Sequence, residues 1–85
     1  MTLTDALEAI LTEHHHSVAK HGTWSDYSVD QMMAVIINEL MVEAGGAESQ
    51  GDIHGEHGVI RELTQVAVCC IKAMMVLSNR EELPR

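Results

Sequence analysis

The chain has 85 residues and a formal net charge of -8, and hydrophobic residues make up 46% of it while aromatic residues make up only 2%. A chain of this length forms one small domain, 1–85, and its acidic balance argues against binding to the phosphate backbone of DNA or RNA. Leu, Ile, Val, Met and Ala must build the core, a composition that favours an all-α fold.

The sequence predicts a reduced, cytoplasmic protein that does not enter a membrane. No apolar stretch approaches the ~20 residues needed to span a bilayer, and the N-terminus has no basic segment of a signal peptide. Cys69 and Cys70 are adjacent, so on a helix they point in different directions and do not easily bridge each other. We interpret them as small core residues.

The first predicted helix covers about residues 3–20. Thr2 and Asp5 form a capping pair at its start, and Gly22 is a natural stop. Its apolar stripe consists of Leu3, Leu7, Ile10, Leu11 and Val18.

Three consecutive histidines, His14–His16, lie near the end of this helix. Glu13 and His16 have the Glu-x-x-His spacing of di-iron bundles, but such sites need a second Glu-x-x-His, which the chain lacks. Three consecutive imidazoles also fan around a helix and cannot converge on one ion. The solvated face of a helix is therefore the favoured interpretation.

The second predicted helix covers about residues 29–44. Ser28 and Gln31 make a Ser-x-x-Gln capping box, and Gly45-Gly46 is the expected stop. The helix is apolar on nearly all sides, which indicates burial on more than one face. In the loop before it, Trp24 either caps the core or offers a stacking surface and an N–H group to a flat ligand.

Two carboxylates interrupt the apolar pattern of this second helix. Met32, Ile36, Glu39 and Glu43 follow one another in steps of four, three and four residues, so they share one stripe. A stripe that begins with Met and Ile points inward. Carboxylates there require a cation, a hydrogen-bond donor or a raised pKa.

The third predicted helix covers about residues 59–80 and repeats this arrangement. Glu62 and Gln65 lie three residues apart at one end of its apolar stripe. Two helices that bring carboxylate or amide oxygens to one place make a site for a hard cation such as Mg²⁺. In the polar loop over 45–58, a metal site of Asp52, His54 and His57 is the less favoured alternative.

At these residues the sequence resembles the MazG-like all-α nucleoside triphosphate pyrophosphohydrolases, over roughly residues 20–77. The family signature is Glu-x-x-Glu on one helix and Glu-x-x-Asp on the next. The resemblance rests on Lys20-His21-Gly22 with Trp24, on 37–44 and on 61–68. Two positions differ: Glu43 lies four residues after Glu39, with Val42 at the three-residue position, and Gln65 replaces Asp.

The resemblance implies Mg²⁺-dependent hydrolysis of (d)NTPs to a nucleoside monophosphate and pyrophosphate, with Mn²⁺ as a possible substitute. It implies a metal site of Glu39, Glu43, Glu62 and Gln65, with Glu39 and Glu43 catalytic. Candidate substrate contacts are Lys20, His21, Trp24, Asn38 and Arg61. The three-helix protomer is expected to form a four-helix-bundle core as a homodimer, or a tetramer of two dimers. The alternative is a non-catalytic oligomerisation or nucleotide-binding module with a degenerate metal site.

Overall fold

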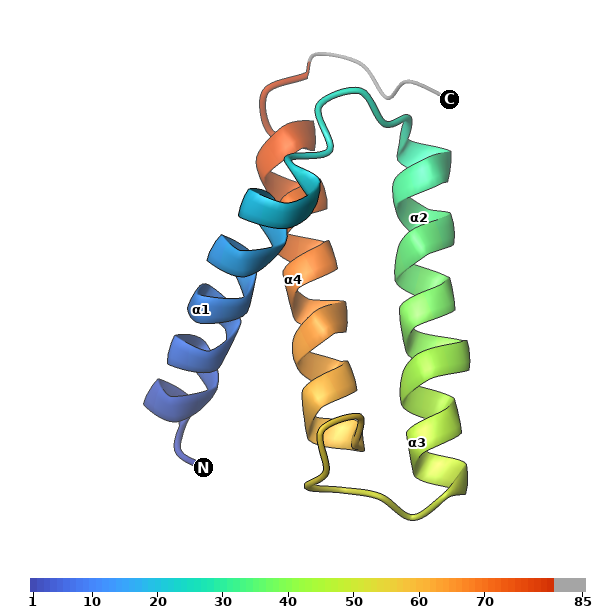
Figure 1. The fold of residues 1–85 in the computed structure, drawn as a ribbon. Helices are drawn as coiled ribbons and strands as arrows, with labels where there is room; N and C mark the ends of the chain where they lie inside the picture. The colour runs from blue at the N-terminus through green and yellow to red at the C-terminus, as the bar shows by residue number, and fades with distance from the viewer. Residues whose placement is uncertain (81–85) are drawn as a thin grey trace.

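The computed structural model describes residues 1–80, and within them the chain is all-helical with no strand. Three helical rods pack side by side (Figure 1). The first is α1 (Leu3–His21), the second is formed by α2 (Val29–Asn38), η1 (Glu39–Ala44) and α3 (Gly45–Ser49) in direct succession, and the third is α4 (Val59–Leu77). α4 contacts both other rods, so it is the central element.

Side-chain caps define the starts of the first two rods, as predicted. The Thr2 hydroxyl accepts a hydrogen bond from the Asp5 backbone N–H (3.1 Å), and the Asp5 carboxylate accepts one from the Thr2 N–H (2.9 Å). Ser28 and Gln31 form the equivalent pair, at 3.1 and 2.8 Å. Each box satisfies N–H groups that have no partner inside the helix.

The predicted end of the second helix at Gly45-Gly46 is wrong, because helical structure continues to Ser49. Glycine in a helix interior costs only about 1 kcal/mol relative to alanine. Ala44 and Ala47, on either side of the glycines, are both buried, and their packing offsets this cost. The following loop is accordingly shorter than expected, and α4 ends at Leu77, three residues before the expected boundary.

The segment η1 is a π-helical turn, and it changes which residues face inward. The Gly45 N–H donates to the Leu40 carbonyl oxygen, five residues earlier, whereas an α-helix would use a residue four positions back. The inward positions therefore pass from Glu39, which is half-buried, to Ala44, which is buried, and Glu43 is exposed. The predicted inward stripe is correct as far as Glu39 and wrong at Glu43.

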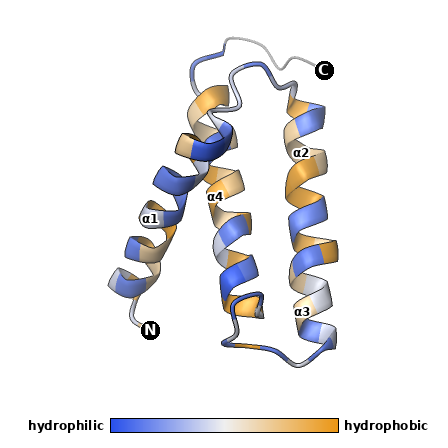
Figure 2. Cartoon of the chain, viewed as in Figure 1, coloured by the Kyte–Doolittle hydropathy of each residue, from blue (hydrophilic) through white to orange (hydrophobic). Residues whose placement is uncertain are grey.

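The core lies between α2 and the C-terminal half of α4, where hydrophobic residues predominate (Figure 2). Met32 is the fully buried side chain of this core, and Val68 of α4 is fully buried as well. Trp24 is also buried and stacks on Tyr27, with ring centroids 5.4 Å apart, while the Lys72 ammonium lies 5.8 Å from the indole centroid. Trp24 thus closes the end of the core, which is the first of the two predicted alternatives.

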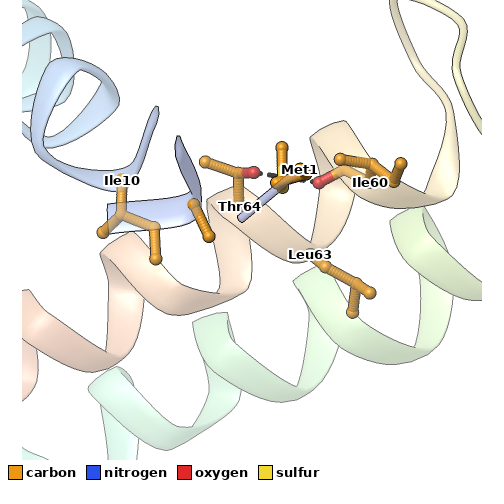
Figure 3. Close-up of a pocket in the computed structure, with 6 residues that line it drawn as sticks. Met1, Ile10, Ile60, Leu63 and Thr64 are labelled. Atoms are coloured by element: carbon orange, nitrogen blue, oxygen red, sulfur yellow. Dashed lines mark hydrogen bonds between the residues drawn. The ribbon is translucent and has the colours of Figure 1, made fainter. Parts of the chain in front are cut away.

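α1 packs on α4 and buries none of its residues fully. An apolar hollow of about 250 Å³ remains between the two helices, lined by residues that include Met1, Ile10 and Leu63 (Figure 3). The Thr64 hydroxyl in this hollow donates to the Ile60 carbonyl oxygen at 2.9 Å. Among residues 1–80, no helix has the length and apolarity needed to cross a membrane.

Candidate functional site

Carboxylates from η1 and α4 line one hollow of about 310 Å³, which we call the acidic hollow. It is the place where the π-helical turn of the long rod faces the first turns of α4. The structure brings together five residues of the predicted site with His57, which the sequence analysis assigned to the alternative loop site, and adds Glu56. The lining residues are Glu39, Glu43, Glu56, His57, Arg61, Glu62 and Gln65.

Glu62 is the most enclosed carboxylate of the acidic hollow, with only 8% of its surface exposed. Its oxygens accept no side-chain or backbone hydrogen bond from residues 1–80, yet they are not sealed from the hollow. The Nδ1 atom of His57 lies 3.8 Å from Oε1 of Glu62, which is beyond hydrogen-bond range. A buried, unpartnered carboxylate is costly unless a cation or donor arrives from outside the chain.

The pKa of Glu39 shows the effect of placing three carboxylates in one hollow. Burial raises the pKa of its carboxyl group, and the negative charges of Glu43 and Glu62 raise it further. Like charges that share one hollow disfavour ionisation of each member. A divalent cation placed among the three carboxylates would reverse this effect.

Glu39 and Glu43 are four residues apart on the π-helical turn, and both line the acidic hollow. A turn closed by an i to i+5 hydrogen bond holds one residue more than an α-helical turn. The extra residue is absorbed within the apolar segment of η1, where Met41 and Val42 are 69% and 59% exposed. The spacing of four residues between Glu39 and Glu43 therefore includes the extra residue of the π-helical turn.

The sequence interpretation missed Glu13, which it considered only for its Glu-x-x-His spacing to His16. The Glu13 carboxylate accepts hydrogen bonds from Arg61 Nη1 at 2.7 Å and from Gln65 Nε2 at 2.8 Å. Burial by itself would raise the pKa of Glu13, but these two donors and the Arg61 charge lower it overall. Of the neighbouring histidines, His15 and His16 are exposed. No local signal in the sequence links positions 13 and 65.

Four predicted substrate contacts do not line the acidic hollow. Lys20 and His21 are at the C-terminal end of α1, where Lys20 is seven residues, or about 10 Å along the helix axis, beyond Glu13. Asn38 is an exposed residue at the end of α2, and Trp24 belongs to the core. Of the predicted cations, only Arg61 is at the hollow.

The loop histidines do not form the alternative metal site. The Asp52 carboxylate accepts a hydrogen bond from the Gly55 N–H at 2.8 Å, so it closes a turn within the loop. His54 lines a different hollow, beside Met1 and Ala9, whereas His57 lies at the acidic hollow. Glu56 and His57 are thus the loop residues at the acidic hollow.

Within residues 1–80, no three His, Cys, Asp or Glu side chains are arranged closely enough to hold a metal ion in the conformation described. Comparisons with protein-family models, with curated proteins and with solved structures give no match for this chain. Any functional assignment therefore depends on the chemistry of the acidic hollow itself.

Proposed function

We propose that the chain is a divalent-cation-dependent pyrophosphohydrolase that cleaves nucleoside triphosphates to a monophosphate and pyrophosphate. The observation that carries the proposal is the acidic hollow, where Glu39, Glu43 and Glu62 come from two different helices. Glu62 is buried without a hydrogen-bond partner among the described residues, and the pKa of Glu39 is raised by burial and by the other two charges. Both features are relieved by a hard cation.

The residues of the acidic hollow fit Mg²⁺ or Mn²⁺ as ligands. Glu39, Glu43 and Glu62 would supply carboxylate oxygens, and Gln65 a neutral amide oxygen. Glu39 and Glu43 are not fully buried, so rotation about their side-chain bonds can turn both carboxylates toward Glu62. When bound, the cation would offset the charge of the triphosphate and lower the pKa of a water molecule.

The proposed hydrolysis moves one proton to the protein. The oxygen of water attacks the α-phosphorus, the bond from this atom to the α–β bridging oxygen breaks, and pyrophosphate leaves with the bond electrons. Glu39, which lines the acidic hollow, accepts the proton of the attacking water. Arg61, 45% exposed at its side chain, keeps donors beyond the one that binds Glu13 and would bind a phosphate oxygen.

A panel of nucleoside triphosphates tests this proposal directly. We expect Mg²⁺-dependent release of pyrophosphate from at least one of them, together with a higher melting temperature in Mg²⁺ than in a chelator. The Glu39→Gln variant should lose turnover and remain folded. Glu48→Gln is the matched control, since it removes the same charge from the same rod outside the acidic hollow. Absence of release from every substrate, with no effect of Mg²⁺ on melting, would overturn the proposal.

We also propose that the protomer assembles with a second copy of itself, a homodimer whose paired helices complete a four-helix core. The supporting observation is the amount of apolar surface left exposed. Met33, Ile37 and Met41 follow one another at four-residue steps along the second rod and are 49–69% exposed. Met74 and Met75 add exposed apolar surface near the end of α4. Assembly of this kind also suits the alternative function, a non-catalytic module.

Light scattering after size-exclusion chromatography distinguishes monomer, dimer and tetramer. Ile37→Glu should shift the assembly toward monomer, because a carboxylate at a buried apolar contact is costly. Tyr27→Phe keeps an exposed apolar side chain elsewhere on the surface and should leave the mass unchanged. A monomeric wild-type chain at micromolar concentration would contradict the dimer.

A further inference from the structure

Glu13 is the only residue of α1 that joins two side chains of the acidic hollow, among those that the structure describes. It reaches across from the middle of α1 to Arg61 and Gln65, which are four residues apart and so share one face of α4. The Glu13 side chain is 13% exposed and the Arg61 side chain 45%, so the accepting carboxylate is the enclosed member of this contact. Hydrogen bonds to a charged acceptor in such surroundings are the strong ones.

The Glu13 contact fixes the orientation of the Gln65 amide. A carboxylate can only accept hydrogen bonds, so the part of the amide that faces Glu13 has to be the NH₂ group. The amide oxygen, Oε1, then points the other way. It accepts no hydrogen bond within residues 1–80 and is not sealed from solvent, and Gln65 lines the acidic hollow.

We propose that Glu13 is a positioning residue that makes Gln65 a cation ligand, and this inference rests on the proposed function. An aspartate offers oxygen to a cation in either orientation of its carboxyl group, whereas a glutamine offers oxygen in only one of two. With the NH₂ group turned toward the hollow, Gln65 would repel a cation. Glu13 excludes that orientation, and Arg61 balances its charge at 2.7 Å.

Binding of Mn²⁺ alone, followed by electron paramagnetic resonance or calorimetry, tests this role without turnover. In Glu13→Gln the side-chain shape is kept, but the new amide can donate as well as accept, so both orientations of Gln65 become available. We expect affinity for Mn²⁺ to fall about 10-fold, the effect typical of losing a group that orients a ligand. Glu8→Gln, the same charge change on α1, should stay within about 2-fold, because Glu8 does not contact Gln65.

A charge swap distinguishes orientation from stability. In the double variant Glu13→Gln with Gln65→Glu, the amide at position 13 donates to one oxygen of the new carboxylate and the other oxygen faces the hollow. We expect this variant to bind Mn²⁺ at least as tightly as the wild type, at an unchanged net charge. Melting temperatures of all variants are measured in a chelator, so that loss of fold is separated from loss of binding.

Each outcome bears on a different claim. If the wild type binds no Mn²⁺ and releases no pyrophosphate, the proposed function and this inference are both overturned. If the wild type binds Mn²⁺ and Glu13→Gln binds it equally well with a lower melting temperature, Glu13 is only structural and the inference alone is overturned. A swap variant as weak as Glu13→Gln would likewise overturn the inference, whereas restored binding supports it.

Discussion

The backbone N–H of Gly45 donates to the carbonyl oxygen of Leu40, and this i to i+5 bond sets the phase of the long rod. It places one residue more in the turn than an α-helix holds, so that Ala44 packs inward while Glu43 lies at the acidic hollow. Without it, the residue directed toward the core would be a glutamate. The same bond therefore serves the packing of the rod and the arrangement of its carboxylates.

Deletion of Met41 should convert η1 into α-helix without changing the phase on either side. Met41 is 69% exposed and contributes little to the core. We expect the free energy of unfolding of the monomer to change by less than about 1 kcal/mol, as for surface changes away from the core. The proposed dimer, whose contact includes Met41, would be weakened in addition. The shortened segment would also hold Glu39 and Glu43 three residues apart. Urea denaturation followed by circular dichroism measures the effect.

Deletion of Met33 is the control for this experiment. Met33 is also exposed, but it lies in the regular α-helix of α2, with no extra residue to absorb the loss. All later residues would rotate by about 100°, so the buried alanines Ala44 and Ala47 would turn away from α4. We expect loss of cooperative folding. Equal tolerance of both deletions would contradict the role of the π-helical turn.

Gly46→Ala should stabilise the protein by about 0.5–1 kcal/mol, because it lowers the entropy of the unfolded chain at a helical position with open space for a Cβ atom. Gly51→Ala should instead destabilise the protein. Gly51 has φ of +70°, a conformation that costs a residue with a Cβ atom about 1–2 kcal/mol. Chemical denaturation compares the two. Destabilisation by Gly46→Ala would contradict the helical continuation through α3.

Patterns of neighbouring residues correctly predicted the starts of the first two helices but not the end of the second. The capping boxes at Thr2 and Ser28 depend on residues three positions apart, so the sequence shows them completely. The stop at Gly45-Gly46 depended on a glycine preference worth about 1 kcal/mol, which the burial of Ala44 outweighs. The apolar run in η1 also gave no indication of which residues face the core, because an apolar side chain fits either the buried or the exposed face of the helix.

For the acidic hollow, the pattern of carboxylates on two helices predicted which residues would lie together, and Glu39, Glu62 and Gln65 do. The contact between Glu13 and Gln65 spans 52 positions. No local sequence pattern predicts this contact, because it depends on how α1 packs against α4. Lys20 and Trp24 were grouped with the site through the resemblance, and the fold places Trp24 in the core instead.

Glu39 predicts a specific dependence of stability on pH in the absence of divalent cations. Its pKa is raised from 4.5 in the folded chain, so the folded chain binds this proton more tightly than the unfolded chain does. The free energy of unfolding should therefore fall as pH rises from about 4.5 through the folded-state pKa, and stay lower above it. Glu39→Gln should remove this decline and be more stable than the wild type at pH 7.

The free energy of unfolding is measured for wild type and Glu39→Gln at each pH with a chelator present. The difference between the two values is used, so that the contributions of other titrating groups cancel. Glu13 acts with the opposite sign, because its lowered pKa contributes stability that is lost as pH falls below about 4.5. Glu48→Gln should leave the decline unchanged. A Glu39→Gln variant less stable than the wild type at pH 7 would show that the carboxylate has a favourable partner.

Cys69 should report on the charge of the acidic hollow through its reactivity. Burial raises the pKa of its thiol from 9.0 to about 11, and the charge of Glu39 adds to this rise while Lys72 opposes it. Alkylation requires the thiolate, whose population at pH 8 is lowered about 100-fold by such a shift. In a Cys70→Ser background, the rate with iodoacetamide should increase about tenfold per pH unit between pH 8 and 10 without reaching a plateau.

Glu39→Gln should increase the alkylation rate of Cys69 at any fixed pH in this range, because removal of the nearby negative charge favours the thiolate. Glu48→Gln should not change it. The readout is the ratio of the rates of two variants at the same pH, since half-burial of Cys69 slows the reagent in every variant equally. A plateau near pH 9 in the wild type, or equal rates with and without the Glu39 carboxylate, would contradict the coupling between this thiol and the acidic hollow.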